Sequence, residues 1–127
     1  MKTFVLISRI LLGLTFLVFG LNGFLNFLPA SMPDGIAGQY VGALFVSHYL
    51  AVVFALELVA GVLLLANRFI VLAIAILAPI LVNVVLFHAC MAPAGFAPAV
   101  IAVALWSVLF YRERAAFSAL LVAKSAS

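Results

Sequence analysis

Residues 69–111 read FIVLAIAILAPILVNVVLFHACMAPAGFAPAVIAVALWSVLFY, a stretch without a single charged side chain. A continuous helix over this stretch would be about 65 Å long, at about 1.5 Å per residue. The hydrocarbon core of a bilayer is only about 30 Å thick, so the chain has to turn back within the stretch. Pro93, Gly95 and Pro98 place that turn at residues 91–98. The stretch therefore predicts two membrane-spanning helices.

The composition of the whole chain indicates a lipid environment. Of its 127 residues, 70% are hydrophobic and 7% are charged, whereas about 25% of the residues in an ordinary soluble domain are charged. So few charges exclude a water-soluble globular protein, and so much apolar surface excludes a disordered chain. The single cysteine, Cys90, excludes an intrachain disulfide framework and a cysteine-based zinc site.

Two earlier apolar runs, residues 4–28 and 36–66, supply the other spans. Helices suit these runs because they lack the alternating polarity of barrel strands, and backbone groups in lipid must be satisfied within the segment. We therefore predict an all-α integral membrane protein in which residues 1–127 form a single four-transmembrane-helix bundle. The expected helices cover residues 4–28, 49–66, 69–90 and 97–111.

Residues 29–48 form the one sizeable segment outside the predicted spans. Pro29, Pro33 and Gly35 make its first part irregular, whereas residues 38–48 are apolar and suited to a helix. We expect a short extracytoplasmic interfacial helix that leads into the second span. An alternative is a lid over the bundle, with glycines that allow close approach to the spans.

The basic residues indicate the orientation in the membrane. With four spans, all six fall on the same side, and cytoplasmic loops are the ones enriched in lysine and arginine. They are Lys2, Arg9, Arg68, Arg112, Arg114 and Lys124. We therefore expect both termini in the cytoplasm. The first span is expected to be retained rather than cleaved as a signal peptide, because Arg9 interrupts it and no A-x-A pattern precedes Pro29.

Several polar side chains fall at similar depths in the outer half of the predicted bundle. At about 1.5 Å per residue, Glu57 lies about 12 Å from the outer end of its span, Asn83 about 11 Å and Asn22 about 9 Å. We take Glu57 as the candidate catalytic residue. The candidate ligand-binding residues are Asn22, Asn83, His88, Asn26 and His48. In the alternative interpretation the asparagines are interhelical hydrogen-bonding groups and the histidines are interfacial side chains.

Glu57 is the hardest of these residues to explain as purely structural. An acidic side chain near the centre of a membrane costs about 3 kcal/mol on insertion scales. No lysine or arginine shares its level, since all of them are expected at the opposite face. We therefore expect Glu57 to be either protonated or hydrogen-bonded to an asparagine or a histidine.

Other chemistries lack the residues that they need. The sequence has no phosphate-binding loop and no glycine-rich nucleotide motif, and neither nucleic acid nor an intrinsic cofactor is expected. His48 and His88 are both predicted near the outer surface without facing each other, so no metal or haem site is expected.

The chain resembles the DoxX family of small four-helix bacterial membrane proteins. The resemblance rests on Arg9-Ile10-Leu11-Leu12-Gly13 followed by Phe19-Gly20-Leu21, on Leu56-Glu57-Leu58-Val59-Ala60-Gly61, and on a charge-poor third helix that ends near His88. Many relatives carry a lysine that could pair with the acid of the second helix, where this chain has Gly23. The resemblance implies the bacterial cytoplasmic (inner) membrane and a link to membrane oxidoreductases, some of which use quinone.

Three functions remain open from the sequence. The first is a quinone- or redox-linked membrane subunit, with the polar residues around the quinone head and Phe19, Phe24 and Phe87 around its tail. Because the sequence has no evident flavin, haem or cluster ligands, such a role would need a redox partner subunit. The second is a non-catalytic scaffold or partner-docking subunit, which could also self-associate as a homo-oligomer. The third, a small transporter, lacks a polar path through the inner half.

Cysteine labelling checks the predicted topology. In a Cys90→Ala background, an Asp34→Cys variant should react with a membrane-impermeant maleimide added outside intact cells, because residues 29–48 are expected there. Arg68→Cys, the matched control, should react only after the membrane is permeabilised. Labelling of Asp34→Cys from the cytoplasm alone would reverse the orientation.

Overall fold

A computed structural model describes residues 1–28 and 31–125 of the chain. Four long helices dominate it: α1 (Lys2–Leu25), α3 (Tyr49–Ala66), α4 (Ile70–Cys90) and α5 (Phe96–Arg112). The shorter elements are α2 (Gly35–Val46), the 3-10 turn η1 (Pro93–Gly95), α6 (Arg114–Phe117) and a second 3-10 turn, η2 (Ser118–Leu121). Residues 29 and 30, at the start of the predicted irregular segment, lie outside the described residues.

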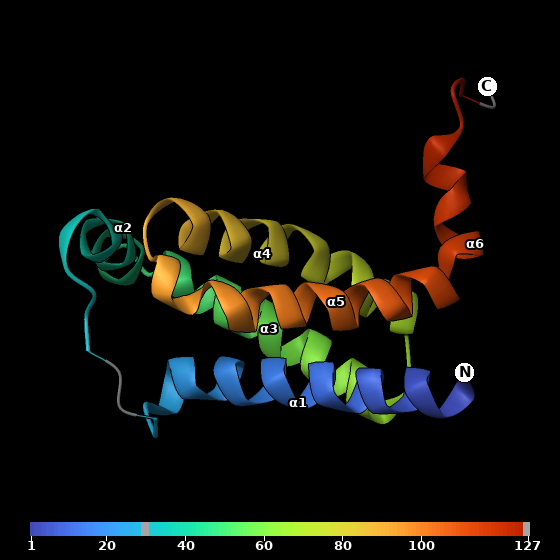
Figure 1. Ribbon diagram of the computed structural model, residues 1–127, viewed down its shortest axis with the longest axis horizontal. Coiled ribbons are helices and arrows are strands. Elements are labelled where there is room, and N and C mark those ends of the chain that lie inside the picture. Colours follow the sequence, from blue (N-terminus) through green and yellow to red (C-terminus); the bar gives the residue numbers. More distant parts are fainter. Residues whose placement is uncertain (29–30, 126–127) are drawn as a thin grey trace.

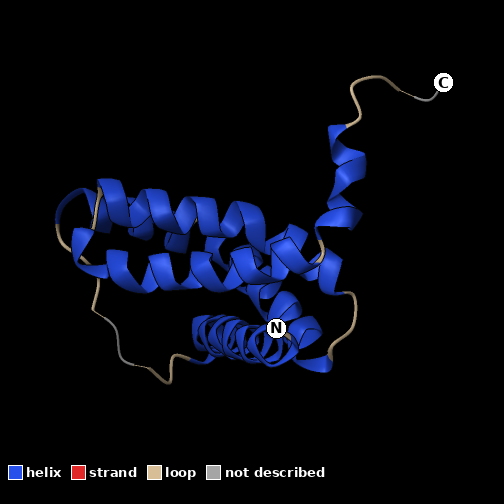
Figure 2. Cartoon of the chain, turned by 45° about the vertical axis from the view of Figure 1, so that its right-hand side comes forward, coloured by secondary structure: helices blue, strands red, loops and turns tan. Residues whose placement is uncertain are grey.

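The prediction of four helices long and apolar enough to cross a membrane is confirmed. The long helices form a bundle, with α2 lying across one end and α6 bending away at the other (Figure 1). From a second angle α1 is strongly foreshortened while two other long helices run across the view, so α1 crosses them at an angle (Figure 2). Large apolar side chains are also exposed on the outside of the bundle, among them Val52 at 63% and Val62 at 48%, as expected of helices that contact lipid.

The first helix ends three residues earlier than predicted, at Leu25 rather than at residue 28. The cause is local: Asn26 adopts a left-handed conformation with a φ of 52°, which asparagine tolerates better than most residues. The side-chain oxygen of Asn22 then accepts a hydrogen bond from the backbone N–H of Leu28 at 2.7 Å. Hydropathy alone misses this ending, because residues 27 and 28 are also apolar.

The short helix α2 also has different bounds from those predicted. It begins at Gly35, whose φ is 67°, and ends at Val46 rather than at residue 48. His48 has a φ of 64° and precedes the first residue of α3. This left-handed residue breaks the chain direction between α2 and α3, which explains why the two helices are separate elements.

The closest helix pair in the bundle is α1 and α3. A Cβ atom added at Gly20 would lie 2.8 Å from the backbone nitrogen of Leu58, and one added at Gly61 would lie 2.6 Å from that of Leu17. The two backbones therefore touch at positions where only glycine fits. At one end of this contact the Arg9 guanidinium donates to the carbonyl oxygens of Leu64 and Leu65, in the last turn of α3.

The core is packed in the half of the bundle that contains Arg9. Its buried members come from all four long helices and include Leu12, Leu64, Ile74, Leu77 and Leu109. The indole Nε1 of Trp106 donates to the Ile74 carbonyl oxygen at 3.0 Å and ties α5 to α4. The apolar helices are therefore held together by close packing in this half and leave the other half less filled.

Replacing Gly61 with alanine tests the close contact of α1 and α3. Gly61→Ala should lower the free energy of unfolding by about 1–3 kcal/mol, because the new methyl group forces the backbones apart. Gly42→Ala is the matched control: nothing lies within 4 Å of a Cβ atom added there, so the better helix former should raise stability by up to about 1 kcal/mol. Unfolding in mixed micelles measures both values, and equal effects would contradict the proposed contact.

Candidate functional site

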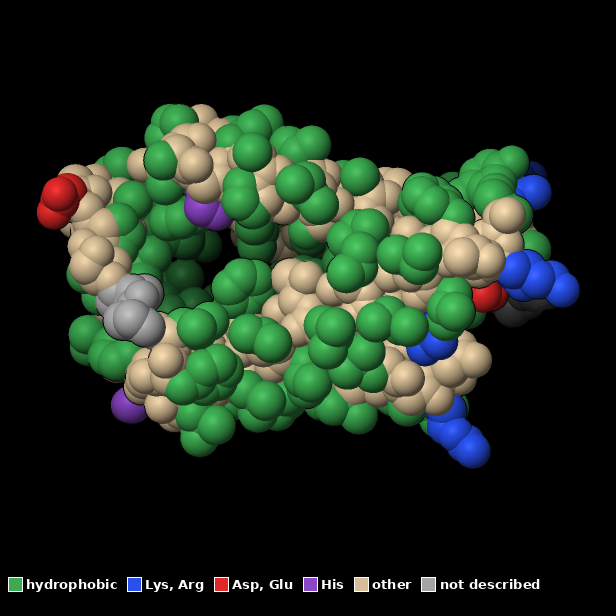
Figure 3. All heavy atoms as spheres, turned by 60° about the horizontal axis from the view of Figure 1, so that its bottom comes forward, with side chains coloured by type: hydrophobic (Ala, Val, Ile, Leu, Met, Phe, Trp, Pro, Cys, Tyr) green, Lys and Arg blue, Asp and Glu red, His purple; other side chains and the backbone are tan. Residues whose placement is uncertain are grey.

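A cavity of about 730 Å³ occupies the half of the bundle next to α2. Every long helix contributes to its wall, together with α2, η1 and residues 31–33 of the connecting segment. Figure 3 shows the surface hollowed at this end, while the lysine and arginine side chains gather at the opposite end. The volume falls within the range of about 300–1,000 Å³ typical of small-molecule sites.

Four of the six predicted site residues line this cavity. They are Glu57 of α3, Asn22 of α1, Asn26 just beyond α1 and His88 of α4. Three different parts of the chain thus place polar groups around one space whose other lining residues are mainly apolar. The structure thus brings these four side chains to one cavity, and their role in binding or catalysis stays a prediction.

Glu57 is the most buried of the four, with 8% of its surface exposed. Its Oε2 atom has no hydrogen-bond partner among the described residues. The sequence left two states open, protonated or hydrogen-bonded to an asparagine or histidine, and no hydrogen bond of Glu57 is found in the described part of the chain. A buried carboxylate without a partner is costly in this apolar setting, so the geometry favours the neutral acid at the wall of this cavity.

The two asparagines, Asn22 and Asn26, both line the cavity and both lie at the end of α1. The Asn22 oxygen is used by the backbone N–H of Leu28, so the amide nitrogen, with two hydrogens to donate, is the part left for a ligand. Asn26 sits at the C-terminal cap of α1 and lines the cavity together with residues 31–33. Both residues therefore shape the end of α1 as well as the cavity wall.

His88 is held in a defined orientation. Its Nδ1 lies 3.0 Å from the carbonyl oxygen of Ala92, and because a carbonyl only accepts, Nδ1 carries the hydrogen. In the neutral ring Nε2 is then a hydrogen-bond acceptor. Gly95 packs so closely on the ring that an added Cβ atom would overlap it. The η1 turn thus fixes the imidazole at the cavity wall.

Two predicted site residues lie elsewhere, and the prediction that Asn83 shares a cavity with Glu57 and Asn22 is wrong. Asn83 is exposed, and its Nδ2 donates to the carbonyl oxygen of Pro79 in its own helix at 2.8 Å. His48 is exposed at the junction of α2 and α3, where its backbone forms the break. Neither residue is among those lining the cavity.

The aromatic wall also differs from the expected one. Of the three predicted phenylalanines only Phe19 lines the cavity, and three that were not predicted also line it: Phe16, Phe45 and Phe54. Phe24 makes an edge contact with Phe54 at 6.3 Å between ring centroids, and Phe87 stacks on Tyr40 at 5.7 Å. The spacing could have revealed Phe16 and Phe54, since Phe16 lies three residues before Phe19, and Phe54 three before Glu57, each on one helix face.

No group of three histidine, cysteine, aspartate or glutamate side chains lies close enough to hold a metal ion within residues 1–28 and 31–125. No family model, no curated protein and no solved structure matches the chain. The similarity to the DoxX family therefore stays a prediction.

Infrared spectroscopy checks the protonation of Glu57. We expect a carbonyl stretch from a protonated carboxyl group at neutral pH, because burial without a partner disfavours the charged form. The band should disappear in Glu57→Gln and persist in Glu113→Gln, which removes an acid from the other end of the bundle. If the native protein lacks the band, Glu57 is ionised and a cation must lie beside it.

Proposed function

We propose that the chain is a DoxX-like subunit of the bacterial cytoplasmic membrane that binds the head group of a quinone in the cavity beside Glu57. The observation that carries the proposal is the buried Glu57 carboxyl group, which has an oxygen without a partner at the wall of a mainly apolar cavity of about 730 Å³. With both termini in the cytoplasm, as the basic residues suggest, this cavity opens toward the outer face of the membrane.

The chemistry of a quinone fits the groups that line the cavity. A quinone head has two carbonyl oxygens that accept hydrogen bonds, and the neutral Glu57 carboxyl and the Asn22 amide nitrogen are donors. In the reduced form the hydroxyl groups of the quinol donate instead, and Nε2 of His88 is an acceptor. Phe16, Phe19 and Phe54 supply apolar walls for the ring and its tail.

A redox role follows if protons move at this site. Reduction of a quinone to a quinol takes up two electrons and two protons, one at each carbonyl oxygen. We assign one of the proton transfers to Glu57, and we assign the electrons to a redox partner subunit. In this proposal the chain is the quinone-binding accessory subunit of a membrane oxidoreductase.

The packing supports this proposal over the two alternatives. A scaffold that self-associates through its glycines would need those glycines on an outer surface, but Gly20 and Gly61 are used in the contact between α1 and α3. A transporter would need a path through the other half of the bundle, where Leu12, Leu64 and Leu77 are fully buried. The cavity beside Glu57 does not continue past these buried leucines, which favours a ligand that enters and leaves from the same side.

Quinone retention and binding test the proposal. The purified protein should carry quinone in its lipid extract, and Glu57→Leu should weaken the binding of a short-chain quinone by roughly three- to tenfold, the value of one hydrogen bond. Glu57→Gln should keep binding, because its amide still donates, but should lose proton-coupled turnover with the partner.

Asn83→Leu is the matched control for these variants. It removes a polar side chain at a similar depth that faces away from the cavity, so it should bind quinone like the native protein. The proposal fails if the native protein neither retains nor binds quinone, or if Asn83→Leu and Glu57→Leu weaken binding equally.

A further inference from the structure

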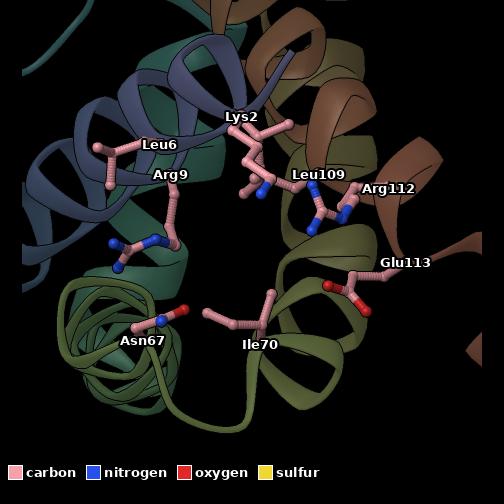
Figure 4. Close-up of a pocket in the computed structure, with 9 residues that line it drawn as sticks. Lys2, Leu6, Arg9, Asn67, Ile70, Leu109, Arg112 and Glu113 are labelled. Atoms are coloured by element: carbon pink, nitrogen blue, oxygen red, sulfur yellow. The ribbon is translucent and has the colours of Figure 1, made fainter.

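A second, smaller cavity lies at the opposite end of the bundle. It has a volume of about 190 Å³ and is bordered by α1, the link between α3 and α4, and the last turn of α5. Figure 4 shows Lys2 and Arg112 on one side of the opening, Asn67 and Ile70 on the other, and Arg9 reaching toward the α3 end. This basic pocket is separate from the cavity at Glu57, and no residue lines both.

The charges around the basic pocket do not cancel. Three cations line it, Lys2, Arg9 and Arg112, against one acid, Glu113. In the part of the chain that the structure describes, the side chains of Lys2 and Arg112 form no hydrogen bond or ion pair. Arg9 donates to the α3 carbonyls from a single nitrogen, Nη1, which leaves most of its five N–H donors free. The pocket thus presents unused donors with an excess of positive charge.

The rest of the wall is apolar. Val5, Leu6 and Ile70 line the pocket, and Leu109, only 1% exposed, closes its floor. Ile70 is the first residue of α4, and no side chain caps that helix start, so its first-turn amides add to the positive potential. A ligand that suits this pocket carries negative oxygens next to apolar atoms.

We propose that the basic pocket binds a phosphate group, with the head group of an anionic phospholipid as its source. Phosphate offers the oxyanion geometry that arginine and lysine donors match. The apolar floor and the position at the end of the spans favour a lipid over free inorganic phosphate, because the glycerol and the first acyl carbons then cover Leu6 and Ile70. This inference does not depend on quinone binding at the other cavity.

Native mass spectrometry with defined lipids tests the proposal. The native protein should retain phosphatidylglycerol more strongly than phosphatidylcholine. The double variant Lys2→Gln/Arg112→Gln should lose roughly tenfold or more of its affinity for phosphatidylglycerol, since each basic residue near an anionic lipid contributes about fivefold. Neither side chain makes a polar contact in the described residues, so the fold should persist, and the melting temperature in detergent confirms that it does.

Arg114→Gln/Lys124→Gln is the matched control, because it removes two charges from the same end outside the pocket. It should change the affinity for phosphatidylglycerol by less than about twofold. Inorganic phosphate at millimolar concentration should not displace the lipid from the native protein; binding of phosphate alone, without any lipid preference, would overturn the lipid source. If both double variants lost the same affinity for phosphatidylglycerol, the pocket would not be a specific lipid site. The lipid would then be held only by general electrostatic attraction to the basic end of the bundle.

Discussion

The backbone contact between α1 and α3 is the constraint on which the rest of the structure depends. In lipid, apolar side chains gain little from leaving their surroundings, so helices associate through close packing and a few polar contacts. Gly20 and Gly61 let the two backbones meet without intervening side chains. Once the helices are this close, Arg9 reaches the last carbonyls of α3 at one end. At the other end, Glu57 comes to share a cavity wall with Phe16 and Phe19 of α1.

The two halves of the bundle differ in packing density because different side chains fill them. Near Arg9, branched side chains from all four long helices interlock around Leu12, Leu64 and Leu77. Near α2, the wall of α5 is built partly from Ala99 and Ala102, and α2 lies across the end of the bundle instead of entering it. Small residues on one wall and a helix that only covers the opening leave space there. Asn22 of α1, Glu57 of α3 and His88 of α4 line that space.

The number of helices long and apolar enough to span a membrane could be predicted from the sequence, because it depends only on hydropathy and on length. The direction in which a residue faces could not. These helices are apolar all round, so they lack the polar stripe that normally marks an outer face. Asn83 and His88 illustrate the consequence. Asn83 is two residues from the buried Leu81, about 200° around the helix, and is exposed, whereas His88 is seven residues from it, nearly on the same face, and lines the cavity.

The packing around Gly23 explains why Glu57 has no cation beside it. Many members of the DoxX family, which the sequence resembles, have a lysine at this position. That lysine could pair with the acid of the second span. Here a side chain at Gly23 would run directly into the ring of Phe54, which itself lines the cavity. The aromatic ring and a lysine therefore compete for the same space, and this sequence has the ring. All six lysines and arginines stay outside the cavity lining, so the site contains a single acid without a counter-charge. A site of this kind is neutral when the acid holds its proton, and it then suits an uncharged ligand with hydrogen-bond acceptors, as a quinone is.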